Sequence, residues 1–405
     1  MPRPRDAVLV GGGLSGLSLL LALTAAPGHD VRRLTLVDPT PLRLDGRAWA
    51  SWTRRRWPVE EAVTRSWRHV GVRLSGPAGG EVRRLDLTPY RYQLLAGERL
   101  AELARRACER ADVELVAGRA VLLRESGAGA ETVLADGSVV RSRWVLDSRP
   151  RQPPPGWRGS WLCFTGRRVR TTRDVFDPDS PVLFDFRTPG GGPGGGARFV
   201  YTLPAGPREA LVEHTALGVR RAAGSGPPRP ADAETALTAY LEAVAGAGGW
   251  QVLGGEAGRL PLPTHRPRRL GPRTLALGAA GGLVRPSTGY AVERVQRDSA
   301  AVVASLTRCG HPFAVPGPRP RHRWLDGVLL DVLAGRPEVF ERVVDGLFTP
   351  DRVRPALAFL DEDTGRFQEA VLLGTLPWTP FLRSALRPAR EPAGERSSGR
   401  TRRPR

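Results

Sequence analysis

Three features of the 405-residue sequence predict an α/β fold. The apolar run Val8–Val10 leads through a glycine-rich turn into a helical stretch at 17–25, an order typical of parallel sheets. A second strand–turn–helix unit begins at Thr274, and a short buried strand at 144–147 lies between the two. Together they predict a Rossmann-type nucleotide-binding domain interrupted by an inserted β-sheet substrate domain and followed by a C-terminal helical region.

The first turn carries three glycines with the spacing G-x-G-x-x-G. We expect Gly11 to make the tight turn, Gly13 to let a pyrophosphate approach the backbone, and Gly16 to pack the helix against the strand. A second predicted strand, 33–37, is followed by Asp38, which lies 22 residues after Gly16. An acid at this distance commonly binds a ribose hydroxyl. This motif alone is consistent with NAD or with FAD.

The later unit narrows the cofactor to FAD. A predicted strand ends at Gly278, and a loop reaching residue 290 precedes a helix predicted at 291–307. This order is similar to the second FAD motif of flavoproteins, where strand and helix start approach the flavin. Many flavoproteins have an acid after the strand glycine, whereas this chain has Ala279. We therefore do not expect a contact between a carboxylate at this position and the ribityl chain. Only one G-x-G-x-x-G follows a predicted strand and opens a predicted helix, so we expect no separate nicotinamide domain.

The positions of these motifs predict a discontinuous organisation with two domains, a cap and a tail. The FAD-binding domain is expected to comprise 1–45, 95–150 and 270–310. The substrate domain is expected to comprise 46–94 and 151–269. A helical cap at 311–385 and a disordered basic tail at 386–405 complete the prediction.

Composition excludes several classes of function. The formal charge is +20 and all 61 basic residues are arginines, so a Walker A loop or a lysine Schiff base is impossible. Lys, Ile and Asn, which have AT-rich codons, are all missing, and this bias accounts for much of the arginine excess. We therefore expect no specific nucleic-acid partner, although a basic nucleic-acid- or membrane-binding protein is the non-enzymatic alternative. The three cysteines are far apart and no Cys/His cluster occurs, so no metal site is expected.

Eight segments between residues 6 and 382 resemble the flavin-dependent lycopene cyclases of bacteria. They are RAWASW at 47–52, FDP at 176–178, LFDFR at 183–187, FVYTLP at 199–204, ALVEHT at 210–215, RPSTGY at 285–290, FLDE at 359–362 and LPWTPFL at 376–382. One departure concerns a glutamine often found four residues before the glycine matching Gly166. This chain has Leu162 there, so no role of that amide is transferred.

The resemblance implies a reaction, its cofactors and its location. The linear ψ-ends of lycopene would be closed to β-rings without net redox change, with reduced FAD required but not consumed and NAD(P)H as its reductant. The protein would be cytoplasmic and peripherally associated with the inner face of the cell membrane, where lycopene resides. The alternative is an FAD-dependent monooxygenase or reductase acting on an isoprenoid, which would consume reductant with each product. One-end or two-end cyclisation, β- or ε-ring product and oligomeric state stay open.

Protonating an alkene requires a carboxylic acid that stays neutral in an apolar site. The resemblance places this acid at Glu213, in a predicted strand whose alternation puts Leu211 and Thr215 on the same face and His214 on the other. Asp185 and Glu256 are the further catalytic candidates.

The remaining site residues are expected on the flavin side and in the substrate tunnel. Gly278, Pro286, Thr288 and Gly289 are expected to contact the flavin. Trp49, Trp52 and Tyr290 are expected to bind the polyene.

Overall fold

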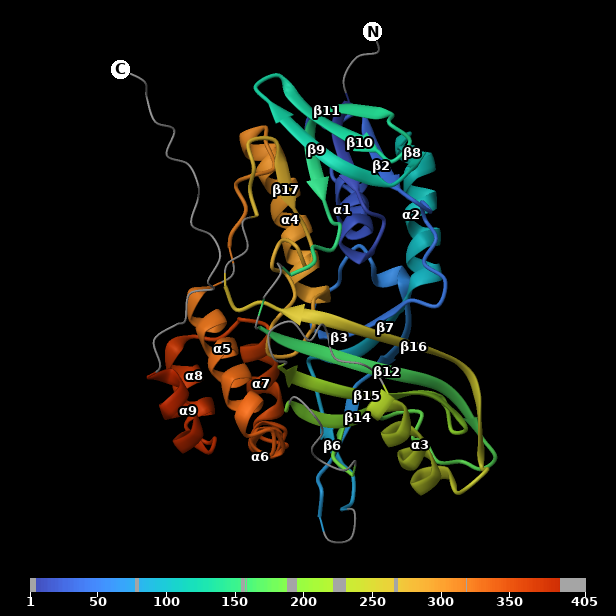
Figure 1. Ribbon diagram of the computed structural model, residues 1–405, viewed down its shortest axis with the longest axis vertical. Coiled ribbons are helices and arrows are strands. Elements are labelled where there is room, and N and C mark those ends of the chain that lie inside the picture. The colour runs from blue at the N-terminus through green and yellow to red at the C-terminus, as the bar shows by residue number, and fades with distance from the viewer. Residues whose placement is uncertain are drawn as a thin grey trace.

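The structure is a computed structural model that describes residues 5–76, 80–153, 157, 159–187, 195–220, 231–265, 269–317 and 319–386. A nucleotide-binding-type sheet lies at one end of the molecule, a second sheet forms the middle, and a group of short helices flanks that second sheet (Figure 1). Beyond residue 386, the predicted basic tail lies outside the described residues.

The first sheet is built from segments far apart in the sequence. Its order is β8-β2-β1-β11-β10-β9, with β17 paired to β11. Its strands are β1 (Arg5–Val10), β2 (Leu34–Asp38), β8 (Glu114–Ala117), β9 (Ala120–Ser126), β10 (Gly129–Leu134), β11 (Val139–Asp147) and β17 (Thr274–Ala276). The pairs β1–β2, β1–β11, β2–β8 and β11–β17 are parallel, as the strand–turn–helix units predict.

Alternation along β1 explains the layers on either side of this sheet. Ala7 and Leu9 pack against helices α1 (Leu14–Ala25), α2 (Gly97–Ala111) and α4 (Val292–Cys309). Val8 and Val10 face the opposite way and pack against apolar side chains of β9, β10 and β11. Both faces of β1 are thus buried, which is why its sequence is continuously apolar.

The second sheet is formed by seven strands from the middle of the chain. Its order is β16-β12-β15-β14-β13-β5-β6. Its strands are β5 (His69–Arg73), β6 (Arg83–Asp86), β12 (Ser160–Thr171), β13 (Val182–Asp185), β14 (Ala197–Gly206), β15 (Glu209–Val219) and β16 (Trp250–Leu262). One face is covered by α3 (Ala231–Ala245), whose Leu237, Tyr240 and Leu241 pack on Val200 and Val212.

A small sheet and a helical region complete the fold. The small sheet has the order β3-β7-β4, with β3 (Ala48–Thr53), β4 (Val63–Trp67) and β7 (Arg91–Ala96), and a short 3-10 helix spans Glu60–Ala62. The C-terminal helices are α5 (Pro320–Gly335), α6 (Val339–Leu347), α7 (Val353–Leu360), α8 (Arg366–Leu373) and α9 (Trp378–Ala385). Among the described residues, none of the helices has the length and apolar character needed to cross a bilayer.

The predicted fold class is confirmed: the chain combines a mixed nucleotide-binding-type sheet with a parallel core, an inserted, mostly antiparallel sheet in which β5 and β13 pair in parallel, and a C-terminal helical region. The predicted helices at 17–25 and 291–307 correspond to α1 and α4, which begin at Leu14 and Val292. The division into separate domains stays a prediction.

Candidate functional site

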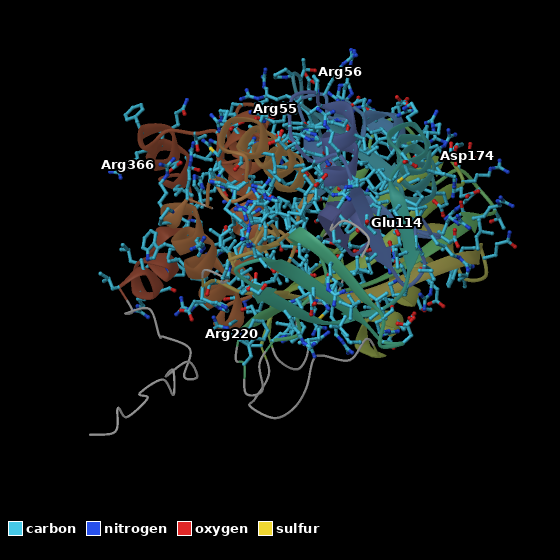
Figure 2. All side chains as sticks on the ribbon, turned by 90° about the horizontal axis from the view of Figure 1, so that it is seen from above. Arg55, Arg56, Glu114, Asp174, Arg220 and Arg366 are labelled. Atoms are coloured by element: carbon cyan, nitrogen blue, oxygen red, sulfur yellow. The ribbon has the colours of Figure 1, made fainter. Side chains whose placement is uncertain are left out.

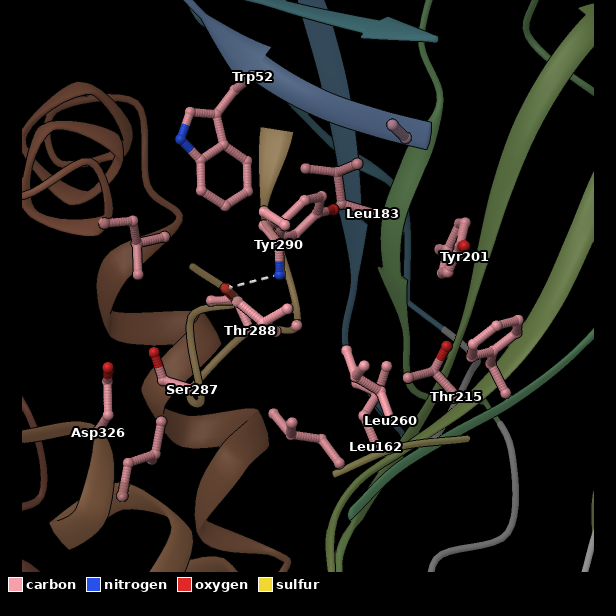
Figure 3. Close-up of a pocket in the computed structure, with 18 of the residues that line it drawn as sticks. Trp52, Leu162, Leu183, Tyr201, Thr215, Leu260, Ser287, Thr288, Tyr290 and Asp326 are labelled. Carbon is pink, nitrogen blue, oxygen red and sulfur yellow. Dashed lines mark hydrogen bonds between the residues drawn. The ribbon is translucent and has the colours of Figure 1, made fainter. Parts of the chain in front are cut away.

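A single cavity of about 850 Å³ extends from the glycine turn of the first sheet to the C-terminal helices. It is lined at one end by Gly13 to Ser15, along its length by the second sheet, and at the other end by Trp324 and Leu382. Figure 3 shows Trp52 and Tyr290 facing the strands that carry Tyr201 and Thr215, with aliphatic side chains between them. Nucleotide motif and apolar chamber are therefore one continuous space.

The glycine turn has the geometry of a pyrophosphate-binding site. A side chain at Gly13 would meet nothing within 4 Å, so its backbone is open to a ligand. A Cβ at Gly16 would lie 2.0 Å from the Gly11 carbonyl oxygen, so only glycine permits this packing of helix on strand. Gly11 itself has φ +97°, in the left-handed region that favours glycine. Gly13, the N-cap residue of α1, has no side chain to cap the helix, which leaves backbone N–H groups at its start free for phosphate oxygens.

Asp38 lies beside this turn. One of its carboxylate oxygens accepts a hydrogen bond from the Gly12 N–H at 2.8 Å, and the other accepts one from the Thr40 N–H at 2.8 Å. The carboxylate is therefore fixed beside the glycine turn, although Asp38 is not among the residues that line the cavity.

The loop from Gly278 to Tyr290 lines the cavity where the nucleotide end meets the apolar chamber. Gly278 has φ +56°, and a Cβ there would lie 2.6 Å from the Ser15 Oγ atom, so the loop approaches the start of α1 closely. Buried Arg285 anchors the loop to α5 through Asp326, with 3.2 Å between Nε and Oδ1. Thr288 and Gly289 line the cavity, whereas Pro286 does not.

Glu213 occupies a row of cross-strand neighbours on the cavity face of the second sheet. It is paired with Tyr201 of β14 on one side and with Gly166 of β12 on the other, and Gly166 is paired in turn with Glu256 of β16. A Cβ at Gly166 would lie 3.3 Å from the Glu256 Cγ and 3.4 Å from the Glu213 Oε2. The nearest neighbour of such a Cβ is the Leu211 Cδ1 atom at 3.2 Å, so the absence of a side chain at Gly166 lets the two glutamate side chains approach each other.

The surroundings of Glu213 favour its neutral form. Its exposed fraction is 4%, and burial raises the pKa of its carboxyl to about 8. A hydrogen bond from Tyr201 lowers this pKa, nearby Glu256 raises it, and the Thr215 hydroxyl, which donates at 3.2 Å, lowers it. Burial outweighs the hydrogen bonds, so most of this acid holds its proton at neutral pH.

The two other predicted carboxylates differ in their placement. Glu256 lines the cavity, and burial raises the pKa of its carboxyl. Asp185 is buried but does not line the cavity: it forms an ion pair with Arg187, with 2.6 Å between Oδ2 and Nη2, and accepts a hydrogen bond from the Tyr240 hydroxyl at 2.9 Å. The structure thus brings Glu256 to Glu213 and gives Asp185 a separate set of partners.

Aromatic rings form the wall opposite the acids. Trp49, Trp52 and Tyr290 all line the cavity, and the rings of Trp52 and Tyr290 lie 4.4 Å apart. The Tyr290 hydroxyl is 2.8 Å from that of buried Tyr92, and the two rings meet edge to face. These contacts fix the rings in place, so they present rigid π-faces to the chamber.

Two residues of this region were not singled out from the sequence. Tyr201 is the cross-strand neighbour of Glu213, and a tyrosine in the apolar strand preceding that acid was the available signal. Asp361 accepts a hydrogen bond from the Trp52 Nε1–H at 2.8 Å, and its second carboxylate oxygen is buried without a partner. Burial raises the pKa of Asp361 to about 7. Since 309 residues separate Asp361 from Trp52, no local pattern could predict this pair.

Comparison with known proteins gives a family and a set of relatives. The family described as lycopene cyclase protein matches residues 6–386. An uncharacterised carotenoid cyclase of Deinococcus radiodurans is 29% identical over 315 residues, covering 75% of this chain and 71% of the relative. A lycopene beta-cyclase of Pantoea ananas is 27% identical over 300 residues, covering 71% of each chain.

Solved structures share the fold at low sequence identity. A geranylgeranyl bacteriochlorophyll reductase-like protein of Thermoplasma acidophilum superposes with a TM-score of 0.60 at 14% identity, covering 94% of this chain and 98% of the other. The flavin-dependent monooxygenase PieE, solved with FAD and substrate, gives 0.55 at 18% identity, covering 92% and 72%. These likenesses show that the chain shares the fold of these two proteins.

Proposed function

The chain belongs to the lycopene cyclase family, and we propose that it converts the linear ψ-ends of lycopene to β-ionone rings by acid-catalysed, redox-neutral cyclisation. The product of one closure is γ-carotene and that of two is β-carotene. The observation that carries the proposal is a buried, protonated Glu213 in an apolar chamber continuous with the nucleotide turn.

Glu213 is the proposed general acid. Its proton adds to C2 of the terminal C1=C2 double bond, and the C5=C6 bond attacks the resulting cation at C1 to close a six-membered ring. Loss of the proton from C6 leaves the C5=C6 double bond of the β-ring, so electrons and protons balance. The rings of Trp52 and Tyr290 stabilise the transient cation through their π-faces, and the Tyr290 hydroxyl is engaged by the Tyr92 hydroxyl.

Glu256 is the proposed acceptor of the C6 proton. It flanks Gly166 on the side opposite to Glu213. The absence of a side chain at this glycine brings the two carboxyl groups near each other, so that the proton can return from Glu256 to Glu213. We expect Gly166→Ala to lower the cyclisation rate about tenfold or more, because the methyl group would separate the two carboxyl groups. Flavin content should be unchanged, and a Gly166→Ala enzyme with the wild-type rate would contradict this path.

FAD fits the residues that are present. Gly11, Gly13 and Gly16 with the α1 N–H groups would hold its pyrophosphate, Asp38 its ribose, and the loop at 278–290 the flavin. Reduced FAD, with NAD(P)H as reductant, would supply negative charge beside the cationic transition state. Asp185 is proposed to hold Arg187 and Tyr240 in place and to take no part in proton transfer.

The substrate also defines the place of action. Lycopene is a hydrocarbon that dissolves in membranes, so we propose that the enzyme works in the cytoplasm while bound peripherally to the inner face of the cell membrane. Expression in lycopene-producing bacterial cells, followed by chromatography of the pigments, tests the activity. β- or γ-Carotene supports the proposal, whereas unchanged lycopene or an oxygenated or reduced product would refute it.

A further inference from the structure

Exposed apolar side chains gather on the helices at the mouth of the cavity. In the described residues, eleven large apolar side chains are exposed, and five of these lie between 324 and 386: Trp324, Phe367, Val371, Leu382 and Leu386. They come from α5, α8 and α9, or directly follow α9. We call these five residues the apolar rim.

Two of the five residues of the apolar rim belong to the cavity as well. Trp324 and Leu382 are exposed to solvent and also line the cavity, so they lie at its opening. Phe367 and Val371 lie one turn apart on α8, which is tied to α5 by the ion pair between Arg321 and Glu369. Hydrogen bonding from the Ser384 hydroxyl to Asp331 ties α9 to α5 as well.

The exposed charged residues of α8 and α9 are positive, and the partly exposed Asp331 of α5 is paired with Arg220. In the sequence of 366–386, the acid is Glu369, which is buried and paired with Arg321, and the basic residues are Arg366 and Arg383, both exposed. Arg366 projects from the outer edge of the molecule (Figure 2). Exposed Trp, Phe and Leu side chains beside arginines, without an exposed acid, are typical of surfaces that insert into the interface of an anionic bilayer.

We propose that the apolar rim docks into the leaflet of an anionic phospholipid bilayer and places the cavity mouth against it. Its role as the portal for a membrane-dissolved polyene rests on the proposed function; the docking itself does not. With Phe367 80% exposed and Leu386 83% exposed, these side chains reach the acyl region while the α8 and α9 backbones stay at headgroup level. The polyene then passes from leaflet to chamber between Trp324 and Leu382 without crossing water.

Vesicle flotation with the full-length holoenzyme tests the docking. The variant Phe367→Ser/Val371→Ser/Leu386→Ser changes only rim residues that do not line the cavity. Its control, Val121→Ser/Leu122→Ser/Val252→Ser, removes exposed apolar side chains from β9 and β16. On vesicles of phosphatidylcholine with phosphatidylglycerol, we expect the rim variant to bind about tenfold or more weakly than wild type, and the control variant to bind as wild type does.

The salt dependence of vesicle binding distinguishes insertion of the apolar rim from electrostatic attraction between anionic lipid and the basic chain. At high salt, wild type should keep part of its binding, since burial of apolar side chains is not screened, whereas the rim variant should lose it. Equal binding of wild type and rim variant at every salt concentration would overturn the proposal. The proposal would also be overturned if the rim variant bound vesicles as wild type does but failed to form a dimer that wild type forms in light scattering. That result would assign the surface to contact with a second copy of the chain.

Activity distinguishes failure of the portal from failure of the proposed function. With lycopene embedded in vesicles, the rim variant should turn over about tenfold or more slowly, and with lycopene in detergent micelles it should match wild type. Slow turnover in both carriers would refute the portal role. Absence of cyclisation by wild type in both carriers would refute the proposed function, while flotation still decides whether the rim docks.

Discussion

Replacing Glu213 by glutamine should abolish ring closure and at the same time stabilise the folded protein. The amide keeps the shape and the hydrogen bonds with Tyr201 and Thr215, but it has no proton to give to an alkene. Loss of a general acid typically lowers the rate by about 10²–10⁴-fold. The measurement is ring formation in lycopene-producing cells, with flavin content of the purified variant as the check on folding.

The gain in stability follows from the raised pKa of Glu213. The folded protein keeps this proton up to a pH of about 8, whereas the unfolded chain releases it near 4.5. The unfolded state is therefore increasingly favoured as pH rises through this window, by about 1.4 kcal/mol per pH unit, which amounts to about 3 kcal/mol at pH 7. Glutamine does not titrate, so the variant should unfold at higher denaturant concentration than wild type at pH 8 and show a much smaller difference at pH 5.

The same strand offers a matched control. Glu209 is partly exposed and paired with Arg170, so Glu209→Gln should leave both the cyclisation rate and its pH dependence nearly unchanged. Near wild-type cyclisation by Glu213→Gln would remove Glu213 from the mechanism and direct attention to Glu256. A stability difference that does not grow between pH 5 and pH 8 would show that Glu213 is not a buried neutral acid.

Three further predictions concern the cofactor, the aromatic wall and pH. Gly16→Ala should abolish retention of FAD, measured by flavin absorbance after gel filtration, because its Cβ would lie 2.0 Å from the Gly11 carbonyl oxygen; full retention would contradict the packing. Trp52→Phe should lower the free energy of unfolding by about 1–3 kcal/mol in urea denaturation, since Asp361 loses its indole donor, and unchanged stability would show that this bond contributes nothing net. The cyclisation rate should fall about tenfold per pH unit above pH 8, as Glu213 ionises, and a flat profile to pH 10 would exclude it as the acid.

The parts of the site that depend on local backbone geometry could be predicted from the sequence. The turn at Gly11–Gly16 is specified by steric limits within a few residues, and the cavity face of Glu213 and Thr215 follows from the two-residue period of a strand. The side chain of His214 lies on the opposite face of the same strand, where it is buried away from the cavity, as the alternation predicts.

The choice among the three carboxylates depended on longer-range structure. Asp185 follows one aromatic residue and precedes another, a context that suggests a buried acid, and it is indeed buried. What the pattern did not show is that Arg187, two residues along the chain, turns back to neutralise it. The meeting of Glu213 and Glu256 above Gly166 depends on the order β15-β12-β16, which no local pattern specifies.

The central claim is proton-initiated, redox-neutral ring closure, and isotope incorporation measures it directly. Pre-reduced holoenzyme would be incubated anaerobically with excess lycopene in D₂O, with mass spectrometry of the product and a parallel assay of reductant. Because the proton shared by Glu213 and Glu256 exchanges with solvent between turnovers, we predict one deuterium at C2 and a mass gain of one per ring formed, with no net consumption of reductant. A cyclic product without deuterium, or one equivalent of reductant oxidised per product, would contradict this account.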